Sequence, residues 1–419
     1  MIETLTLPPG VTLRCFRDDR FKQGRLTLQF VRPMGREEAS CNALLPAVLL
    51  RGTQKHPDLR SITMHLDDLY GTAVGDLVRR IGDYQTTGLS CTFTEDRFAL
   101  PGDQIEAPAV AFLRELLLEP KLENGAFCRE FVESEKKNLL ADLESQKNDK
   151  QSYAANQLLK HMCSADSFGI PRLGTKESLQ AITPESLYRH YRMLLETAAV
   201  EIFYVGSREP QAVAGLLENL FRGIGRSYVN LPPQTPFHDN GPAQVREKMD
   251  ITQSRLNMGF VTDITNCSGD FAAMQMLNTV FGGGMTSKLF MTVREKMSLC
   301  YSIGSGYYGS KGILTVGAGI DASQADTVRQ EVLRQLDACR NGDITPSELE
   351  SARQYLLSGL RTVHDSPGSI EGYHATAALS GLALTLDDYR RQVSTVDIPR
   401  LQAAANSLRF HSEFFLEGQ

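Results

Sequence analysis

The sequence lacks several features that would assign a function at once. No apolar run approaches the roughly 18–20 residues that a membrane-spanning helix needs. The first ten residues, MIETLTLPPG, have neither a basic region nor an apolar core, so we expect no secretory signal. Clusters of lysine and arginine are missing too, and the net charge is −6, from 44 basic and 50 acidic residues. This balance argues against nucleic acid as the main partner.

Metal and redox motifs are also missing. The eight cysteines are scattered without a CxxC pair, which indicates small buried side chains in a reducing compartment. Because we expect neither a secretory signal nor a membrane span, we predict a cytoplasmic protein. No two of the eight histidines have HExxH or HxxEH spacing. The densest cluster, His65 with Asp67 and Asp68, falls on a predicted helix. Successive helix residues face different directions, so a solvated surface is the simpler interpretation.

Two common enzyme classes find no support either. The sequence contains no GxSxG, the strand-to-helix turn that carries the nucleophile of many serine hydrolases. The glycine run at 282–284 lacks the lysine and serine or threonine of a phosphate-binding loop, so we expect no nucleotide.

The chain is long enough for more than one core, and its two halves repeat one order of predicted elements. Alternating apolar residues at 26–30 recur at 256–260, each followed by helices and a strand pair. A proline-rich stretch at 228–245 has little periodicity and is predicted to be a linker. We therefore predict an α+β protein with two similar domains, 1–227 and 246–419. Each should be a mostly antiparallel sheet with helices packed on one face.

The most informative stretch is FGGGMTSKLFMTVREKMSLCY at 281–301. Gly282, Gly283 and Gly284 predict backbone angles closed to other residues, or a helix that starts close to a sheet, or backbone N–H groups open to a peptide. Thr286 or Ser287 then caps a helix. Its apolar face should hold residues 289, 290, 293 and 297, and the helix should end near 298.

Arg294 and Tyr301 lie seven positions apart, on either side of the predicted helix-to-strand turn. An arginine offers a rigid fork of donors, and a tyrosine offers one hydroxyl. Such a pair could hold a peptide carbonyl or stabilise a developing oxyanion. A surface arginine and a packed strand tyrosine is the alternative.

With this stretch in view, the sequence resembles the pitrilysin/insulinase-type peptidases, the inverted-motif zinc peptidases that include the mitochondrial processing peptidase. The resemblance covers nearly the whole chain as two family domains. Its strongest part is the stretch at 281–303, and weaker support comes from Arg51-Gly52-Thr53 and from the helix at 135–149. It implies that Arg294 and Tyr301 are the groups that the second domain presents to substrate.

The sequence departs from that family at the metal. Aligned on Arg51-Gly52-Thr53, the two histidines of HxxEH fall on Ala43 and Ala47, and the glutamate falls on Pro46. The distal ligand falls near Asp142, with Glu135 and Glu144 as alternatives. Catalytic zinc needs three protein ligands and an open position, so we expect no zinc and no hydrolysis in this domain.

The resemblance therefore implies a non-catalytic subunit. It would pair with an HxxEH-bearing homologue, which would hold the only zinc, and would complete that partner's peptide site in trans with Arg294 and Tyr301. A homodimer is possible when the partner is missing. One alternative is a structural or peptide-binding protein with no role in hydrolysis, and another is an autonomous metallopeptidase with an unrelated metal site.

Overall fold

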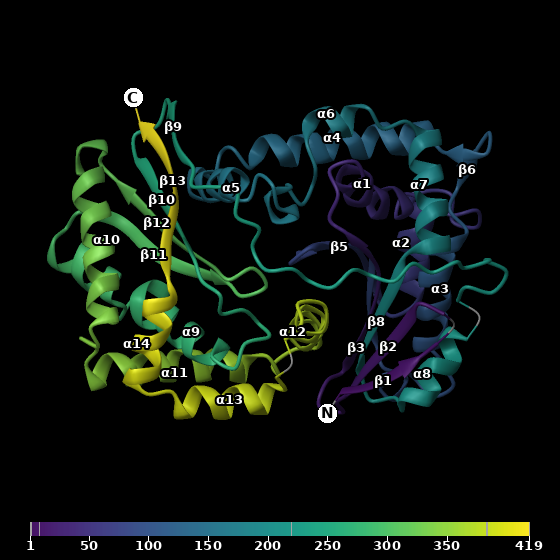
Figure 1. Ribbon diagram of the computed structural model, residues 1–419. Coiled ribbons are helices and arrows are strands. Elements are labelled where there is room, and N and C mark those ends of the chain that lie inside the picture. Colours follow the sequence, from purple (N-terminus) through teal and green to yellow (C-terminus); the bar gives the residue numbers. More distant parts are fainter. Residues whose placement is uncertain (1, 8, 219, 383, 419) are drawn as a thin grey trace. The chain divides into compact units, whose positions relative to one another are not determined.

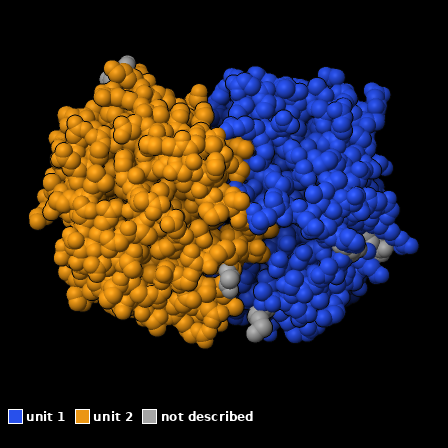
Figure 2. Space-filling model, in the orientation of Figure 1, with its two compact units in different colours: residues 1–144, 171–233, 364–376 blue, residues 145–170, 234–363, 377–419 orange. Residues whose placement is uncertain are grey.

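The computed structural model describes residues 2–7, 9–218, 220–382 and 384–418. These residues form two compact units, which Figure 2 shows in different colours. Unit 1 holds residues 1–144, 171–233 and 364–376, and unit 2 holds residues 145–170, 234–363 and 377–419. Each unit is an α+β fold built on one main sheet, as predicted.

The main sheet of unit 1 has six strands. In spatial order they are β1 (Ile2–Thr6), β2 (Val11–Arg17), β8 (Ala199–Gly206), β3 (Gln23–Pro33), β5 (Tyr84–Thr94) and β4 (Ala73–Ile81). Only β2 and β8 pair in parallel. A two-stranded hairpin, β6 (Leu122–Glu123) and β7 (Ala126–Phe127), lies apart from this sheet.

Helices cover one face of this sheet, towards which alternate apolar residues of β3 point. Leu26, Leu28 and Phe30 of β3 pack against helix residues such as Leu44 and Leu113 in one buried core. The helices of unit 1 are α1 (Ala39–Leu49), α2 (Leu59–Asp68), α3 (Glu106–Leu118), α4 (Arg129–Ser145), α6 (Lys176–Gln180), α7 (Pro184–Thr197), α8 (Pro210–Leu217) and most of α12 (Pro367–Leu379).

Unit 2 has a five-stranded sheet in the spatial order β11 (Cys300–Tyr308), β12 (Ile313–Ile320), β10 (Ser254–Val261), β13 (Arg409–Gly418) and β9 (Gln244–Met249). Its helices are α5 (Lys150–Met162), α9 (Phe271–Asn278), α10 (Ala325–Arg340), α11 (Pro346–Thr362), α13 (Leu386–Thr395) and α14 (Ile398–Ser407). There are also two π-helical segments, η3 (Thr279–Gly283), which includes the first two glycines of the run, and η4 (Phe290–Lys296), which follows the run.

The two sheets share one topology, which is the structural form of the sequence repeat. The order β2-β8-β3-β5-β4 in unit 1 corresponds to β9-β13-β10-β12-β11 in unit 2, and in both the first pair is parallel and the others antiparallel. Strands β4 and β11 are therefore equivalent, and each is an edge strand.

The units are not contiguous in the sequence, a feature that the division into 1–227 and 246–419 does not describe. Residues 145–170 belong to unit 2, where α5 packs on β13 through Leu158 and Phe414. Residues 364–376 belong to unit 1, and Figure 1 shows α12 on the side of that sheet opposite α3 and α7. Each sheet thus has an exchanged helix on its second face.

Glu371 fixes the exchanged α12 to the sheet of unit 1. Its carboxylate is 1% exposed and accepts two hydrogen bonds from Arg79, at 2.8 and 2.7 Å. The side chains of Thr27 and Gln29 on β3 donate to it as well, each at 3.1 Å. These polar residues explain why β3 alternates apolar and polar side chains although both of its faces are buried.

Three parts of the sequence interpretation need revision. The predicted linker at 228–245 ends inside β9, which pairs with β13. The strands β1 and β2 and the helices between 367 and 395 were not predicted, although β2 alternates apolar residues and Thr385 caps the helix α13. Among the helices that the structure describes, none is long and apolar enough to cross a membrane.

Candidate functional site

The positions where the family motif would lie are all on helix α1. Ala43 is buried, Pro46 is buried inside the helix, and Ala47 is partly exposed. Ala43 and Ala47 are four residues apart, so their side chains lie on one face of the helix. Both line a groove of about 540 Å³.

Pro46 changes how α1 is held. Proline has no N–H, so the carbonyl of Asn42, four residues earlier, loses its helical partner. Thr87 of β5 replaces that partner by donating its hydroxyl to the Asn42 carbonyl at 2.6 Å. The helix is therefore continuous through Pro46, and the sheet satisfies the orphaned acceptor.

A buried amide network, which no sequence motif predicts, continues from the same residue. Asn42 donates its side-chain amide to Gln85 Oε1 at 2.9 Å, and Asn42 Oδ1 lies 2.7 Å from His190 Nε2. Burial lowers the pKa of His190 to about 4, so this imidazole is neutral and donates to Asn42. The network fastens α1 to β5 and α7.

Helix α4 brings two of the three candidate distal ligands to the groove. Glu135 and Asp142 both line it, together with residues of β4. Glu135 is already held by Arg51, with Nη1 3.0 Å from Oε1. Glu144 does not line the groove and pairs instead with Lys176 at 3.1 Å.

These residues do not fit a zinc ion. Methyl groups stand at two of the aligned ligand positions, a proline ring stands at the third, and a carboxylate of the groove is engaged by arginine. Across the described residues, no group of three His, Cys, Asp or Glu side chains could hold a metal ion. Of the His65 cluster, Asp67 and Asp68 are exposed, while the His65 ring packs 4.7 Å from the ring of Phe112.

In the glycine run of unit 2, close packing concerns Gly282, and none of the three glycines has an unusual backbone angle. None of Gly282, Gly283 and Gly284 has a positive φ, so the predicted conformational freedom is not used. A Cβ on Gly282 would lie 2.7 Å from Ser305 Oγ and 2.9 Å from Leu289 Cδ1, whereas one on Gly284 would meet nothing closer than 3.8 Å. Gly282 is therefore required by the approach of η3 to β11.

Ser287 caps the following helix, as one of the two predicted candidates. Its Oγ accepts a hydrogen bond from the Phe290 N–H at 3.4 Å. The helix then widens into the π-helix η4, which has more residues per turn than an α-helix. Leu289 and Val293 are buried as predicted, but Met297 is 39% exposed because the wider turn moves it off the buried face.

The π-helix presents Arg294, and a β-bulge presents Tyr301. The pairing of β11 with β12 shifts register between Cys300 and Ser302, so Tyr301 has no partner residue and its side chain is 74% exposed. The Arg294 side chain is 42% exposed, and its guanidinium lies 4.6 Å from the centre of the Phe290 ring. Rare π-helices and bulges concentrate at functional sites, and both occur here within one short stretch.

Known proteins resemble this chain over part or nearly all of its length. A family model described as the peptidase M16 inactive domain matches residues 181–356. A probable inactive metalloprotease of Bacillus subtilis (strain 168), YmfF, is 26% identical over 409 residues, covering 98% of this chain and 96% of that protein. The chain is therefore similar to insulinase-type (M16) peptidases of the inactive kind, and its own sequence lacks HxxEH.

Solved structures share this fold. A conserved protein from Enterococcus faecalis V583 has a TM-score of 0.92 and 29% identity, covering 100% of this chain and 99% of that one. A chain of Complex III2 from Candida albicans has a TM-score of 0.75 and 16% identity, covering 100% and 96%. The latter similarity concerns the fold alone.

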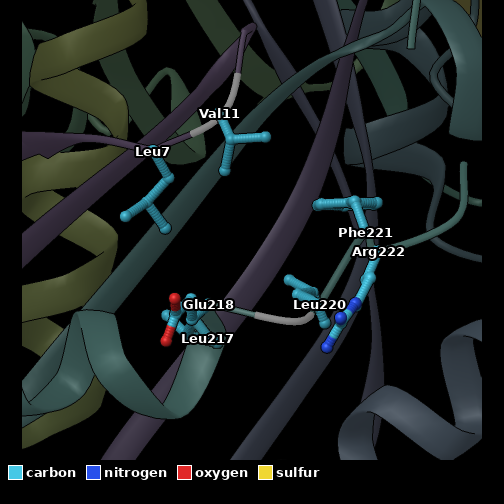
Figure 3. Close-up of a pocket in the computed structure, with 7 residues that line it drawn as sticks. All are labelled: Leu7, Val11, Leu217, Glu218, Leu220, Phe221 and Arg222. Carbon is cyan, nitrogen blue, oxygen red and sulfur yellow. The ribbon is translucent and has the colours of Figure 1, made fainter. Parts of the chain in front are cut away.

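A second hollow of this M16 homologue, of about 360 Å³, lies beside β1, β2 and α8 in unit 1. Figure 3 shows its seven lining residues, which are Leu7, Val11, Leu217, Glu218, Leu220, Phe221 and Arg222. None of the residues predicted from the family motif is among them, and the hollow is mostly apolar.

Proposed function

We propose that this chain is the non-catalytic subunit of a two-chain zinc peptidase. Unit 2 would present Arg294 and Tyr301 to a peptide held at the zinc of an HxxEH-bearing M16 partner. The observation that carries the proposal is the contrast within the chain. The aligned metal positions hold alanine and proline, while the arginine and tyrosine of the second motif point to solvent from a π-helix and a bulge.

The two exposed side chains suit this role chemically. The guanidinium of Arg294 offers a planar fork of donors to a peptide carbonyl, and the hydroxyl of Tyr301 offers one more. Donors placed where negative charge develops lower the barrier to peptide hydrolysis. The partner would supply zinc and the activated water, so this chain needs no cofactor of its own.

The substrate class in this proposal is an extended peptide or protein segment. Strand β4 ends the sheet of unit 1 and β11 ends that of unit 2, so each leaves one row of backbone groups without a neighbouring strand. A peptide adds to such an edge through its main chain, which gives affinity with little demand on sequence. The eight cysteines all lie among the described residues and form no disulfide there, which supports the cytoplasm as the proposed compartment.

A mixed-subunit assay tests the proposal. Tagged protein from a native extract should recover an HxxEH-bearing homologue, and the complex should cleave peptides in a chelator-sensitive manner while the isolated chain does not. Arg294→Ala should lower turnover of the complex about 100-fold without dissociating it. Lys296→Ala, on the same π-helix, is the matched control and should leave turnover unchanged. Equal turnover of the Arg294 variant and the wild type would refute the catalytic contribution.

A structural or peptide-binding subunit is the second candidate. The fold occurs in a chain of Complex III2 from Candida albicans, and so within a large assembly. This candidate predicts recovery of partners without HxxEH and no cleavage by any resulting complex. An isolated homodimer that binds peptide without cleaving it would favour it as well.

A further inference from the structure

The β4 edge of unit 1 is occupied at one point by the chain's own side chain. Arg172 Nη1 donates a hydrogen bond to the carbonyl of Val78 at 2.9 Å. In an antiparallel sheet, alternate residues of an edge strand direct both backbone groups away from the neighbouring strand. Val78 is such a residue, and Asp76 and Val74 share its orientation. The guanidinium thus occupies a carbonyl oxygen that an added strand would use as a hydrogen-bond acceptor.

Arg172 is held in place by its backbone. Gln85 donates its side-chain amide to the Arg172 carbonyl at 2.7 Å and to the Ala39 carbonyl at 3.1 Å. Gly174, with φ +73°, lies so close to Ser40 that a Cβ there would be 1.9 Å from Ser40 Oγ. This segment is therefore fixed to the start of α1.

The contacts that hold Arg172 also reach helix α1, where the family's HxxEH would lie. Gln85 accepts a hydrogen bond from the side-chain amide of Asn42. The Asn42 carbonyl accepts a hydrogen bond from Thr87, because Pro46 has no N–H to offer it. A continuous set of contacts therefore runs from the altered motif helix through Gln85 to Arg172 and the β4 edge. Arg172 also lines the groove that contains Ala43 and Ala47.

We propose that Arg172 is a built-in occupant of the β4 edge, which an extended peptide displaces when it adds to the sheet beside the groove. This inference rests on the peptide-docking part of the proposed function and assigns a regulator to it. The guanidinium satisfies one edge carbonyl while no peptide is present, which also protects the edge from pairing with other chains. Peptide affinity is lowered by the free energy of breaking that hydrogen bond.

Fluorescence anisotropy of the full chain tests this, with fluorescein-labelled 15-residue peptides tiling the unfolded protein β-casein as probes. Arg172→Ala should bind them about three- to tenfold more tightly than wild type, the range expected for one displaced hydrogen bond. Arg60→Ala is the control, because it removes one positive charge from an exposed part of α2 in the same unit. It should bind as wild type does.

A proline scan of the edge makes the test specific. Asp76→Pro removes an outward N–H without breaking a bond to β5, so the sheet should stay intact by circular dichroism. Combined with Arg172→Ala, it should abolish the gain in affinity. Equal or weaker binding by Arg172→Ala, binding insensitive to Asp76→Pro, or no binding by any variant would each overturn the inference. The mixed-subunit assay is a separate experiment, so its result tests the proposed function independently of the result for Arg172.

Discussion

Strands β4 and β11 hold equivalent places in two sheets of the same topology, but they have diverged in opposite directions. Around β4, Pro46, the Asn42 network and Arg172 connect the walls of the groove to one another and to the strand edge. Around β11, a bulge turns Tyr301 to solvent. Two copies of one fold can thus differ in which side chains cover the same edge strand.

The largest expected effect comes from restoring the missing imidazoles in unit 1. Ala43→His with Ala47→His places two imidazoles on one face of α1, in the groove that Asp142 also lines. We expect zinc binding near micromolar affinity, about 8 kcal/mol, by isothermal titration calorimetry. Adding Asp142→Ala should remove it, and failure of the double variant to bind zinc would contradict the alignment of HxxEH with residues 43–47.

The next effect concerns the exchanged helix α12. Glu371→Ala leaves Arg79 without its buried carboxylate, so the free energy of unfolding should fall by about 3–5 kcal/mol, measured by urea denaturation. Glu350→Ala removes an exposed pair with Arg353 on α11 and is expected to cost less than about 1 kcal/mol. Similar losses for the two variants would show that α12 is not fixed by Glu371.

Acid should weaken unit 1 through its neutral histidines. Burial lowers the pKa of His190 and of His374 to about 4, whereas an unfolded histidine titrates near 6.5. Between those values the unfolded chain binds protons that the folded chain does not, so stability present above about pH 6.5 is lost as the pH falls towards 4.

Each histidine should contribute about 2 kcal/mol to that loss. Urea denaturation at pH 7 and pH 4.5 measures it, and His190→Gln should flatten the dependence while keeping a donor for Asn42. An unchanged pH dependence in that variant would mean that His190 is accessible to protons in the folded protein.

The smallest expected effect is a difference in protein stability between alanine substitutions at two glycines of the unit 2 motif. Gly282→Ala forces a methyl group against Ser305 and Leu289 and should destabilise the protein by about 1–3 kcal/mol. Gly284→Ala meets open space and should change stability by less than about 0.5 kcal/mol. Thermal unfolding compares the two, and equal effects would indicate that the glycine run serves something other than packing.

Much of the fold could be predicted because periodicity and caps are local signals. The strands at 73–81, 84–94 and 300–308 and the cap at Thr345 were visible in alternation and in turn residues. The exchange of α5 and α12 was not visible. Helix α12 has no apolar stripe, and its place depends on Glu371, whose partners are about 300 positions away in the sequence.

In the candidate site too, local features could be predicted from the sequence and non-local contacts could not. Residue identity alone showed that Ala43, Pro46 and Ala47 cannot form HxxEH, and the spacing of Arg294 and Tyr301 is a local pattern. The π-helices, the bulge and the Gln85–Arg172 contact depend on how β11 and β4 meet their neighbours. No sequence periodicity reports such non-local contacts. The roles assigned to Arg294, Tyr301 and the glycines therefore stay predictions.

Metal content and chain identity of the native complex test the central claim most directly. Native mass spectrometry of the tagged protein purified from its own extract should show this chain paired with an HxxEH-bearing homologue and one zinc per pair. Dissociation should leave the zinc with the partner, and the separated chains should each lack peptidase activity. Zinc retained by this chain, or peptide cleavage by this chain alone, would contradict the account.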